Sequence, residues 1–206
     1  QLAVRAKQLE LEALQARIRP HFLFNTLNTG AALVHARPDE AERVLLDLAD
    51  LFRTALRGPQ EIPLAEELAL ARRYLDIEAL RLGQRLVVRW QQPPELPGID
   101  VPALSIQPLV ENAVRHGIEP RRGGGTLDLS VCIKGDAVEV MVANDLPDAA
   151  PAAAGHAIGL ASSRQRVEAL TNGSGRLESG LEQGRYVARV VVPIRERREA
   201  PQATTR

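Results

Sequence analysis

The sequence has few of the residues that mark several protein classes. Cys132 is the only cysteine among 206 residues, so no disulfide can form within one chain. Its alternating apolar context predicts a buried thiol, which is consistent with a reducing compartment. Aromatic residues make up only 3% of the chain, so leucine, alanine and valine must fill the core. Basic and acidic residues are equal at 26 each, which argues against nucleic acid as the main partner.

Long apolar runs are also absent. No run approaches the roughly 20 residues that a membrane-spanning helix needs, and no signal peptide is visible. The length suits one large domain or two small ones. Because the chain opens in a helical pattern without a starting methionine, we expect a fragment whose earlier part was removed.

The first half has helical periodicity. Residues 2 to about 35 predict one long helix, bent near Pro20 because proline lacks the backbone N–H that a helix interior uses. A stripe that begins apolar at Leu11 turns polar at His21, Asn25 and Asn28. Something other than packing therefore selects these polar residues, although on spacing alone they could equally line a solvated helix edge.

A second helix is predicted from Ala41 to Leu56, after a break at residues 37–40 and before Gly58 and Pro59. It carries two neighbouring apolar stripes, Val44, Leu48, Leu51 and Ala55 beside Leu45, Ala49, Phe52 and Leu56. These stripes are wider than one partner helix can cover. We therefore expect an antiparallel hairpin that pairs with a second copy into a dimeric four-helix bundle. A third helix, from Pro63 to a stop at Gly83, is expected to connect this bundle to the remainder.

The second half mixes period-two and helical patterns. A helix is predicted over residues 105–116, capped near Ser105 and closed by Gly117. A charged, disordered tail is expected from Arg195. The remaining expected segments are a strand at 86–90, a proline-rich connection at 91–102, a hairpin of strands 127–133 and 138–142, a loop at 145–155, a helix at 158–170, and strands at 175–181 and 186–194. The fold class is therefore α+β, with helices on one face of a mostly antiparallel sheet.

Side chains that could bind a metal ion or phosphate lie on the predicted helix over residues 105–116. Helical geometry stacks Glu111 with Arg115 and Asn112 with His116, opposite an apolar face. The amide oxygen of Asn112 could hold Mg²⁺, a hard cation that is often coordinated by phosphate oxygens as well. Arg115 and His116 could bind phosphate oxygens. Taken alone, a surface helix with an internal salt bridge is the more ordinary interpretation.

A second candidate is the stretch of residues 155–160, in which Gly155 and Gly159 open a helix. Glycines there let backbone N–H groups approach a phosphate. The pattern is unspecific, because many helices begin this way. It also lacks the Gly-Lys-Ser/Thr ending of a P-loop.

Together these segments resemble the LytS/YehU/AlgZ family of bacterial sensor histidine kinases. Residues 14–28 resemble the family's phosphoacceptor helix, and residues 101–118 resemble its N-box. Ile158, Gly159 and Leu160, with Arg164 and Arg166 behind them, resemble its second glycine box. The resemblance covers about residues 10–194. It implies a dimerisation and phosphotransfer hairpin (1–60), a connecting helix (61–84), an ATP-binding domain of the Bergerat (GHKL) type (85–195) and a tail (196–206).

The resemblance also implies roles for individual residues. His21 becomes the residue phosphorylated by ATP, and Asn112 becomes the Mg²⁺ ligand. Glu111 and His116 become polar contacts around the triphosphate, and Gly155 and Gly159 flank a lid over the nucleotide. The adenine contact falls on residues 143–147, where Asn144, followed by Asp145, replaces the usual aspartate. The amide oxygen of Asn144 can still accept a hydrogen bond from the adenine amino group.

The implied function is that of a sensor kinase. His21 would take the γ-phosphoryl group of ATP, with Glu111 as a possible base, and pass it to an aspartate of a response regulator, expected to be of the LytTR DNA-binding type. Asn25, one turn after His21, could orient a water that dephosphorylates the regulator, or could simply be a helix-edge residue. The implied location is the cytoplasmic portion of a bacterial inner-membrane protein, attached through a missing sensor portion.

Two alternatives remain open from the sequence. The first is a degenerate nucleotide-binding protein that does not phosphorylate itself, because Asn144, Leu146 and Ala157 depart from the family pattern. The second is a dimeric scaffold whose helices transmit a signal by rotation or by bending at Pro20.

Overall fold

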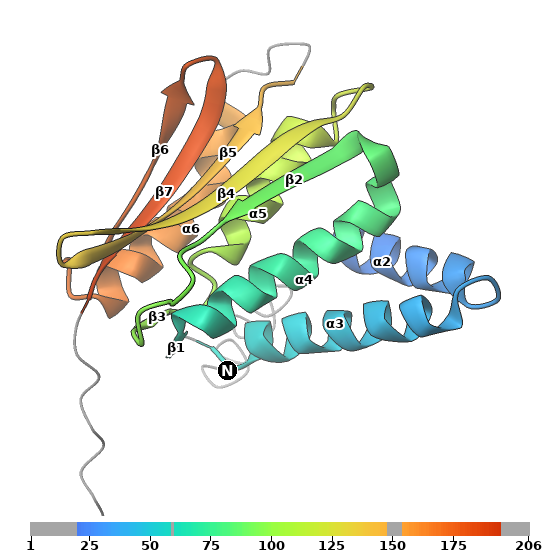
Figure 1. Ribbon diagram of the computed structural model, residues 1–206, viewed down its shortest axis with the longest axis horizontal. Coiled ribbons are helices and arrows are strands. Elements are labelled where there is room, and N and C mark those ends of the chain that lie inside the picture. The colour runs from blue at the N-terminus through green and yellow to red at the C-terminus, as the bar shows by residue number, and fades with distance from the viewer. Residues whose placement is uncertain (1–19, 59, 148–153, 195–206) are drawn as a thin grey trace, which may run out of the picture.

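The computed structural model describes residues 20–58, 60–147 and 154–194, with only the backbone described for residues 154–159 (Figure 1). The expected first part of the long helix and the expected C-terminal tail lie outside the described residues. Most of the expected loop over residues 145–155 lies outside them too.

The N-terminal described elements form a helical hairpin. The described part of helix α2 spans Pro20–Leu33. Helix α3 (Pro38–Leu56) begins at a proline, and acids in its first turn suit the positive end of the helix. The predicted break and restart are confirmed. The first of the two predicted stripes on α3 is buried, whereas Leu45 and Leu56 of the second stay exposed.

Helix α4 (Leu64–Leu82) lies between this hairpin and the sheet (Figure 1). It ends at Gly83, whose φ of +57° favours glycine. The predicted seam of Leu64, Leu68, Ala71, Leu75 and Leu82 is buried. Because the helix contacts α2 and α3 on one side and α5 and β2 on the other, its polar residues Glu67 and Glu78 are buried as well.

Five strands form the main sheet, in the order β2-β4-β5-β7-β6. The strands are β2 (Leu86–Gln91), β4 (Gly125–Lys134), β5 (Ala137–Asp145), β6 (Arg176–Glu182) and β7 (Arg185–Pro193). The predicted hairpins β4–β5 and β6–β7 are confirmed as antiparallel pairs. Strand β2 pairs in parallel with β4 at one edge, a pairing that the sequence did not reveal. A 3-10 turn, η1 (Gly83–Arg85), leads from α4 into β2.

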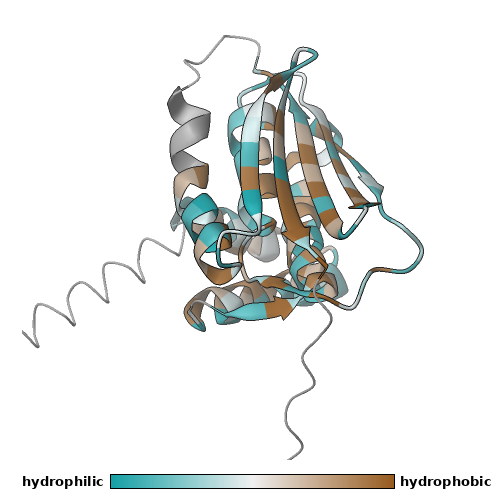
Figure 2. Cartoon of the chain, turned by 90° about the vertical axis from the view of Figure 1, so that its left-hand side faces the viewer, coloured by the Kyte–Doolittle hydropathy of each residue, from teal (hydrophilic) through white to brown (hydrophobic). Residues whose placement is uncertain are grey.

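Helices α5 (Gln107–Ala113) and α6 (Ala154–Leu170) cover one face of this sheet, and a π-helical turn, η2 (Val114–Ile118), continues α5 (Figure 1). The covered face is apolar because alternate residues of each strand point to it, including Val138, Val140 and Val142 of β5. Apolar and polar bands therefore alternate across the strands in Figure 2. The predicted α+β class, with helices on one face of the sheet, is confirmed.

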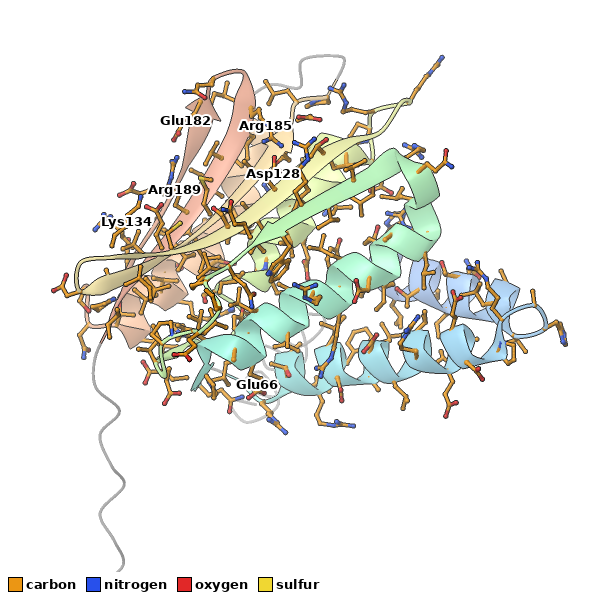
Figure 3. All side chains as sticks on the ribbon, viewed as in Figure 1. Glu66, Asp128, Lys134, Glu182, Arg185 and Arg189 are labelled. Carbon is orange, nitrogen blue, oxygen red and sulfur yellow. The ribbon has the colours of Figure 1, made fainter. Side chains whose placement is uncertain are left out.

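The opposite face of the sheet carries charged residues in pairs. Arg185 binds Asp128, and Arg189 binds Glu182 through Nη2 and Oε2 at 2.6 Å (Figure 3). Lys134 Nζ lies 2.7 Å from Glu139 Oε1. Such pairs are typical of a sheet face that stays in contact with water.

Three expectations were wrong. Cys132 is exposed, because it shares the outer face of β4 with Asp128 whereas its neighbour Val131 faces the core. Ser105 does not cap helix α5, since Ile106 holds the N-cap position and no side chain caps it locally. Nor does Gly117 close that helix, because it lies within the π-helical turn. In addition, a small antiparallel sheet of β1 (Glu61–Pro63) and β3 (Asp100–Pro102) was not foreseen.

Candidate functional site

His21 lies in α2, one residue after Pro20, with its side chain exposed. The amide nitrogen of Asn25, one helical turn later, lies 3.3 Å from Nδ1 and 3.4 Å from Nε2 of the imidazole. The structure therefore brings the two predicted residues of this helix together around one ring.

The neighbour of His21 anchors the start of α2 to α4. The rings of Phe22 and Tyr74 lie 4.9 Å apart between centroids, at an interplanar angle of 36°, which is an ordinary tilted aromatic contact. Tyr74 is buried, and Phe22 packs against the main core. This contact holds the backbone of His21 beside α4 while its ring stays accessible.

A buried carboxylate from α4 holds the start of α5. Glu67 Oε2 accepts the backbone N–H of Leu104 at 2.9 Å, and Oε1 accepts those of Ile106 and Gln107 at 2.8 and 3.1 Å. The N–H groups of Ile106 and Gln107 are among those that a helix start leaves without partners. Burial raises the pKa of Glu67, and the backbone donors oppose that rise.

The end of α5 meets the end of β5 at Gly117. A Cβ atom on Gly117 would lie 2.0 Å from Nδ2 of Asn144 and 2.9 Å from the carbonyl oxygen of Asp145. Only glycine allows this approach of the π-helical turn to the strand. Asn144 itself lies on the covered face of β5, two residues after Val142, and is fully buried. The predicted N-box helix and the predicted adenine-contact segment are therefore neighbours.

Unpartnered polar atoms mark this junction. Asn112 is 2% exposed, and neither its Oδ1 nor its Nδ2 has a hydrogen-bond partner among the described residues. Asn144 donates through Nδ2 to the carbonyl oxygen of Asp145 at 2.8 Å, but its buried Oδ1 is unpartnered in the same part of the chain. Buried amides are normally satisfied, so unsatisfied ones indicate a site for a further group.

The other site residues that the sequence predicts differ in their hydrogen bonds and in their exposure. Glu111 Oε1 accepts a 2.8 Å hydrogen bond from Gln107 Nε2 on the same helix. Arg115 is exposed and His116 is half-buried, both in the π-helical turn. Asp145 is engaged within the sheet, because its Oδ2 accepts the N–H of Thr126 at 2.8 Å and its Oδ1 lies 3.2 Å from Arg185 Nε.

The expected lid residues are only partly described. Gly155, Ile158 and Gly159 lie within the helical span of α6, and their side-chain surroundings fall outside the described residues. Leu160 is buried in the core. Arg164 donates through Nε to the carbonyl oxygen of Leu177 at 3.0 Å, which ties α6 to β6.

A charged cluster links α4 to the end of the N-box, and the sequence did not reveal it. Arg81 Nε donates to Glu78 Oε2 at 3.0 Å, and Arg81 Nη1 donates to Glu119 Oε1 at 2.9 Å. Arg85 Nη2 donates to the carbonyl oxygens of Glu119 and Arg121 at 2.9 and 2.8 Å. Burial raises the pKa of Glu78, while Arg81 opposes the rise, and His21 is among the charges that act on this carboxyl.

One signal in the sequence could have found these acids. Glu67 and Glu78 each lie at a spacing of three or four from the apolar seam residues of α4. A carboxylate at a seam position must be buried with partners, so it indicates a specific polar contact.

Comparisons with known proteins agree with the resemblance stated above. Residues 9–86 match the family described as histidine kinase. The sensor histidine kinase YpdA of Escherichia coli (strain K12) is 34% identical over 216 residues, covering 94% of this chain. The chain is homologous to LytS- and YpdA-type sensor histidine kinases. The sensor histidine kinase/phosphatase LytS of Staphylococcus aureus (strain MRSA252) is 38% identical to this chain over 138 residues, which cover 66% of this chain.

The chain matches only part of these relatives, 37% of the length of YpdA and 24% of the length of LytS. Among solved structures, the catalytic domain of histidine kinase ThkA matches with a TM-score of 0.48 at 17% identity, over 66% of this chain and 95% of that one. ThkA in complex with the response regulator protein TrrA also matches at 0.48, with 16% identity, over 94% of this chain and 65% of that one. None of the described helices is long and apolar enough to cross a bilayer.

Proposed function

We propose that this chain is the catalytic portion of a sensor histidine kinase that phosphorylates itself on His21 with ATP. The observation that carries the proposal is the amide of Asn112, which is 2% exposed and has no hydrogen-bond partner among the described residues, in the segment that resembles the N-box. The exposed imidazole of His21, which Asn25 contacts, supplies the acceptor in the same chain. The kinase names of the relatives support the same activity.

The reaction is a phosphoryl transfer to nitrogen. A ring nitrogen of neutral His21 donates its lone pair to the γ-phosphorus of ATP. The bond from that phosphorus to the bridging oxygen breaks, and ADP leaves with the electron pair. As the imidazole gains positive charge, the proton on its other ring nitrogen passes to a base, for which Glu111 is the proposed residue. A phosphohistidine results, from which the phosphoryl group passes to an aspartate.

The residues at the junction of α5 and β5 fit a nucleotide with a divalent ion. Asn112 Oδ1 is a hard oxygen ligand of the kind that Mg²⁺ prefers, and Asn144 Oδ1 is an acceptor for an amino group such as that of adenine. No three His, Cys, Asp or Glu side chains gather into a metal site in the described residues, so most ligands of an ion here would be phosphate oxygens and waters. When bound, Mg²⁺ neutralises phosphate charge and orients the phosphates for transfer.

The partner and the assembly belong to the same proposal. A response regulator is the proposed acceptor of the phosphoryl group, of the LytTR DNA-binding type that the resemblance implies. A second copy of the chain is the proposed partner for the α2–α3 hairpin. The proposed location is cytoplasmic, next to a membrane-bound sensor portion. The domain limits at residues 60, 84 and 195 remain predictions.

Incubation with γ-labelled ATP and Mg²⁺ tests the core of the proposal. We expect acid-labile, base-stable label on the wild type and none on the His21→Gln variant. The His35→Gln variant, which changes an exposed histidine between α2 and α3, is the matched control and should label normally. Label that persists in His21→Gln would overturn the proposal.

Nucleotide binding separates the kinase from its alternative. The amide of Asn144 in place of a carboxylate favours weaker adenine binding, because a neutral acceptor forms the weaker hydrogen bond. Calorimetric binding of a non-hydrolysable ATP analogue to the wild type, with no label on His21 under the conditions above, would favour a degenerate nucleotide-binding protein. Loss of that binding in Asn112→Ala would support the placement of the phosphates.

A further inference from the structure

Leu104 has a backbone conformation that leucine seldom adopts. It lies between β3 and α5, and its φ of +59° falls in the left-handed region that favours glycine. Asn172 and Gln183 also have positive φ, but both are exposed polar residues. Leu104 is half-buried. A strained residue of this kind persists only where neighbouring groups hold it in place.

Two helices hold the backbone on either side of Leu104. Glu67 of α4 accepts the N–H of Leu104 through Oε2 at 2.9 Å. Arg166 of α6 donates through Nη1 to the carbonyl oxygen of Leu104 at 3.1 Å and to that of Ala103 at 3.5 Å. Both peptide groups that flank Leu104 are therefore hydrogen-bonded, which opposes their rotation into a relaxed conformation.

The conformation of Leu104 sets the direction in which α5 leaves the small sheet. Strand β3 ends at Pro102 and α5 begins at Gln107, so only residues 103–106 join them. Since φ and ψ are the soft dihedrals of the backbone, a relaxed φ at Leu104 would redirect the chain that follows. Asn112 lies on α5, and its buried amide has no partner among the described residues. The direction of that amide thus depends on Leu104.

Arg166 connects this turn to a second part of the site. Helix α6 carries at its start the residues that resemble the second glycine box, and it packs against α5 and β3. A planar guanidinium has several N–H donors in fixed directions, so one arginine can contact two neighbouring carbonyl oxygens. Glu67 is fully buried whereas Arg166 is half-buried. Arg166 is therefore the partner of Leu104 that can be replaced with less effect on folding.

We propose that Arg166 is a positioning residue for nucleotide binding, which holds Leu104 in the left-handed conformation and thereby directs Asn112 toward the phosphates. This inference rests on the proposed function, in which Asn112 contacts Mg²⁺ and the phosphates. Arg166 acts through the backbone of Leu104 and does not itself contact the nucleotide.

The first test measures the strain at Leu104 without nucleotide. Leu104→Gly and Leu104→Ala both remove the side chain, but only glycine adopts a φ of +59° without steric cost. We expect Leu104→Gly to unfold at a Tm about 2–4 °C above that of Leu104→Ala, by circular dichroism. At an ordinary φ the order would reverse, because glycine loses more conformational entropy on folding. A Leu104→Ala variant as stable as Leu104→Gly, or more stable, would overturn the inference.

The second test measures the affinity for a non-hydrolysable ATP analogue with Mg²⁺, by calorimetry. In Arg166→Met we expect Kd to rise about tenfold, the effect of one lost hydrogen bond from a charged group. Arg166→Lys keeps a charged donor and should recover part of this loss. Gln165→Met changes an exposed neighbour on α6, and this matched control should bind as the wild type does. A Kd in Arg166→Met equal to that of the control would overturn the inference.

A double-mutant cycle separates positioning from a general loss of stability. In Leu104→Gly the left-handed conformation needs little support, so Arg166→Met should raise Kd by no more than about twofold in that background, against about tenfold in Leu104→Ala. Equal rises in the two backgrounds would overturn the inference, because they would show that Arg166 acts on another part of the molecule.

Failure of the proposed function would give a different result. A folded wild type that does not bind the analogue would overturn the proposed function. The same cycle, measured as Tm, would still decide whether Arg166 holds Leu104. The fall in Tm caused by Arg166→Met should then be smaller in Leu104→Gly than in Leu104→Ala, and equal falls would contradict the role of Arg166.

Discussion

Asn144 shows how a single substitution can keep the geometry of a site while changing its charge. Its amide donates to the carbonyl oxygen of Asp145, which a carboxylate in its place would not do at neutral pH. This bond fixes the direction of Oδ1, which has no partner in the part of the chain that the structure describes. Rigid placement of one acceptor offsets part of what the missing charge would have contributed to a hydrogen bond.

Gly117 is predicted to be the residue that tolerates least change at this junction. In Gly117→Ala the new Cβ would lie 2.7 Å from Cγ of the buried Asn144 and 2.9 Å from a backbone oxygen. We expect the free energy of unfolding to fall by about 1–3 kcal/mol, as overpacked cores do, and nucleotide binding to be lost. Chemical denaturation and calorimetry measure the two effects. Gly123→Ala, where no atom lies within 4 Å of the added Cβ, is the control, and equal behaviour of the two variants would contradict the prediction.

Among the elements, α4 is the one that joins the others. Its first half supplies the carboxylate that satisfies the start of α5, and its last turn supplies the arginine that reaches the residue after η2. Both ends of the N-box are therefore attached to one helix. A shift of α4 would carry the N-box with it, because hydrogen-bonded groups at both ends resist relative motion.

Replacement of Glu67 should destabilise the fold strongly. Glu67→Ala leaves the N–H groups of Leu104, Ile106 and Gln107 without their acceptor. We expect a loss of roughly 2–4 kcal/mol in the free energy of unfolding, since unsatisfied buried donors keep their full desolvation cost. Its neighbour Glu66 is exposed (Figure 3), and Glu66→Ala should change stability by less than about 0.5 kcal/mol. A similar small change in both variants by urea denaturation would refute the capping role.

The β6–β7 hairpin carries a pH-dependent pair. Hydrogen bonds from Arg189 hold the pKa of Glu182 below its ordinary value of 4.5. The unfolded chain therefore binds this proton more readily, so the pair stabilises the fold fully above pH 4.5 and loses its effect as pH falls through the lowered pKa. We expect the stability difference between wild type and Glu182→Gln to disappear on acidification and to shrink in high salt. A double-mutant cycle with Arg189→Gln at pH 7 measures the pair, and additive single effects would contradict it.

In the molecule as a whole, the hairpin has more apolar surface than one chain covers. Leu45 and Leu56 of α3 are 44% and 50% exposed, and Phe24 of α2 is 63% exposed. These exposed residues are distinct from the buried seam that faces α4. Large exposed apolar residues on helices are typical of association surfaces.

Light scattering with size-exclusion chromatography tests the predicted dimer. We expect wild type at twice the chain mass of 22.5 kDa, and the double variant Leu45→Ser/Leu56→Ser at the monomer mass, because serine removes the apolar contact area. Val87→Ser changes a residue of similar exposure, 46%, at the edge strand β2, and it should remain dimeric. Wild type that elutes as a monomer at micromolar concentration would overturn the predicted bundle.

The periodicity of the sequence was sufficient to predict most of the helices and strands. Glycine and proline marked the ends of α3, α4 and the two hairpins, and the apolar spacing identified the buried seam of α4. The motif-bearing helix and the exposed histidine were also predictable, because residues three and four apart on a helix share a face whatever the rest of the chain does. Asn112, at one of those positions, is where a buried and unpartnered amide is found.

Only the tertiary structure decided which faces meet. The parallel pairing of β2 with β4 and the contacts of Glu67 and Arg81 join segments 30 or more residues apart. The exposure of Cys132 depends on which side of its strand another element covers. Local spacing tells which face is apolar but not which segment will cover it, because that choice is made by the packing of the whole chain. The sequence thus determined the elements and the candidate histidine, and the fold determined that Glu67 and Arg81 of one helix hold both ends of the N-box segment.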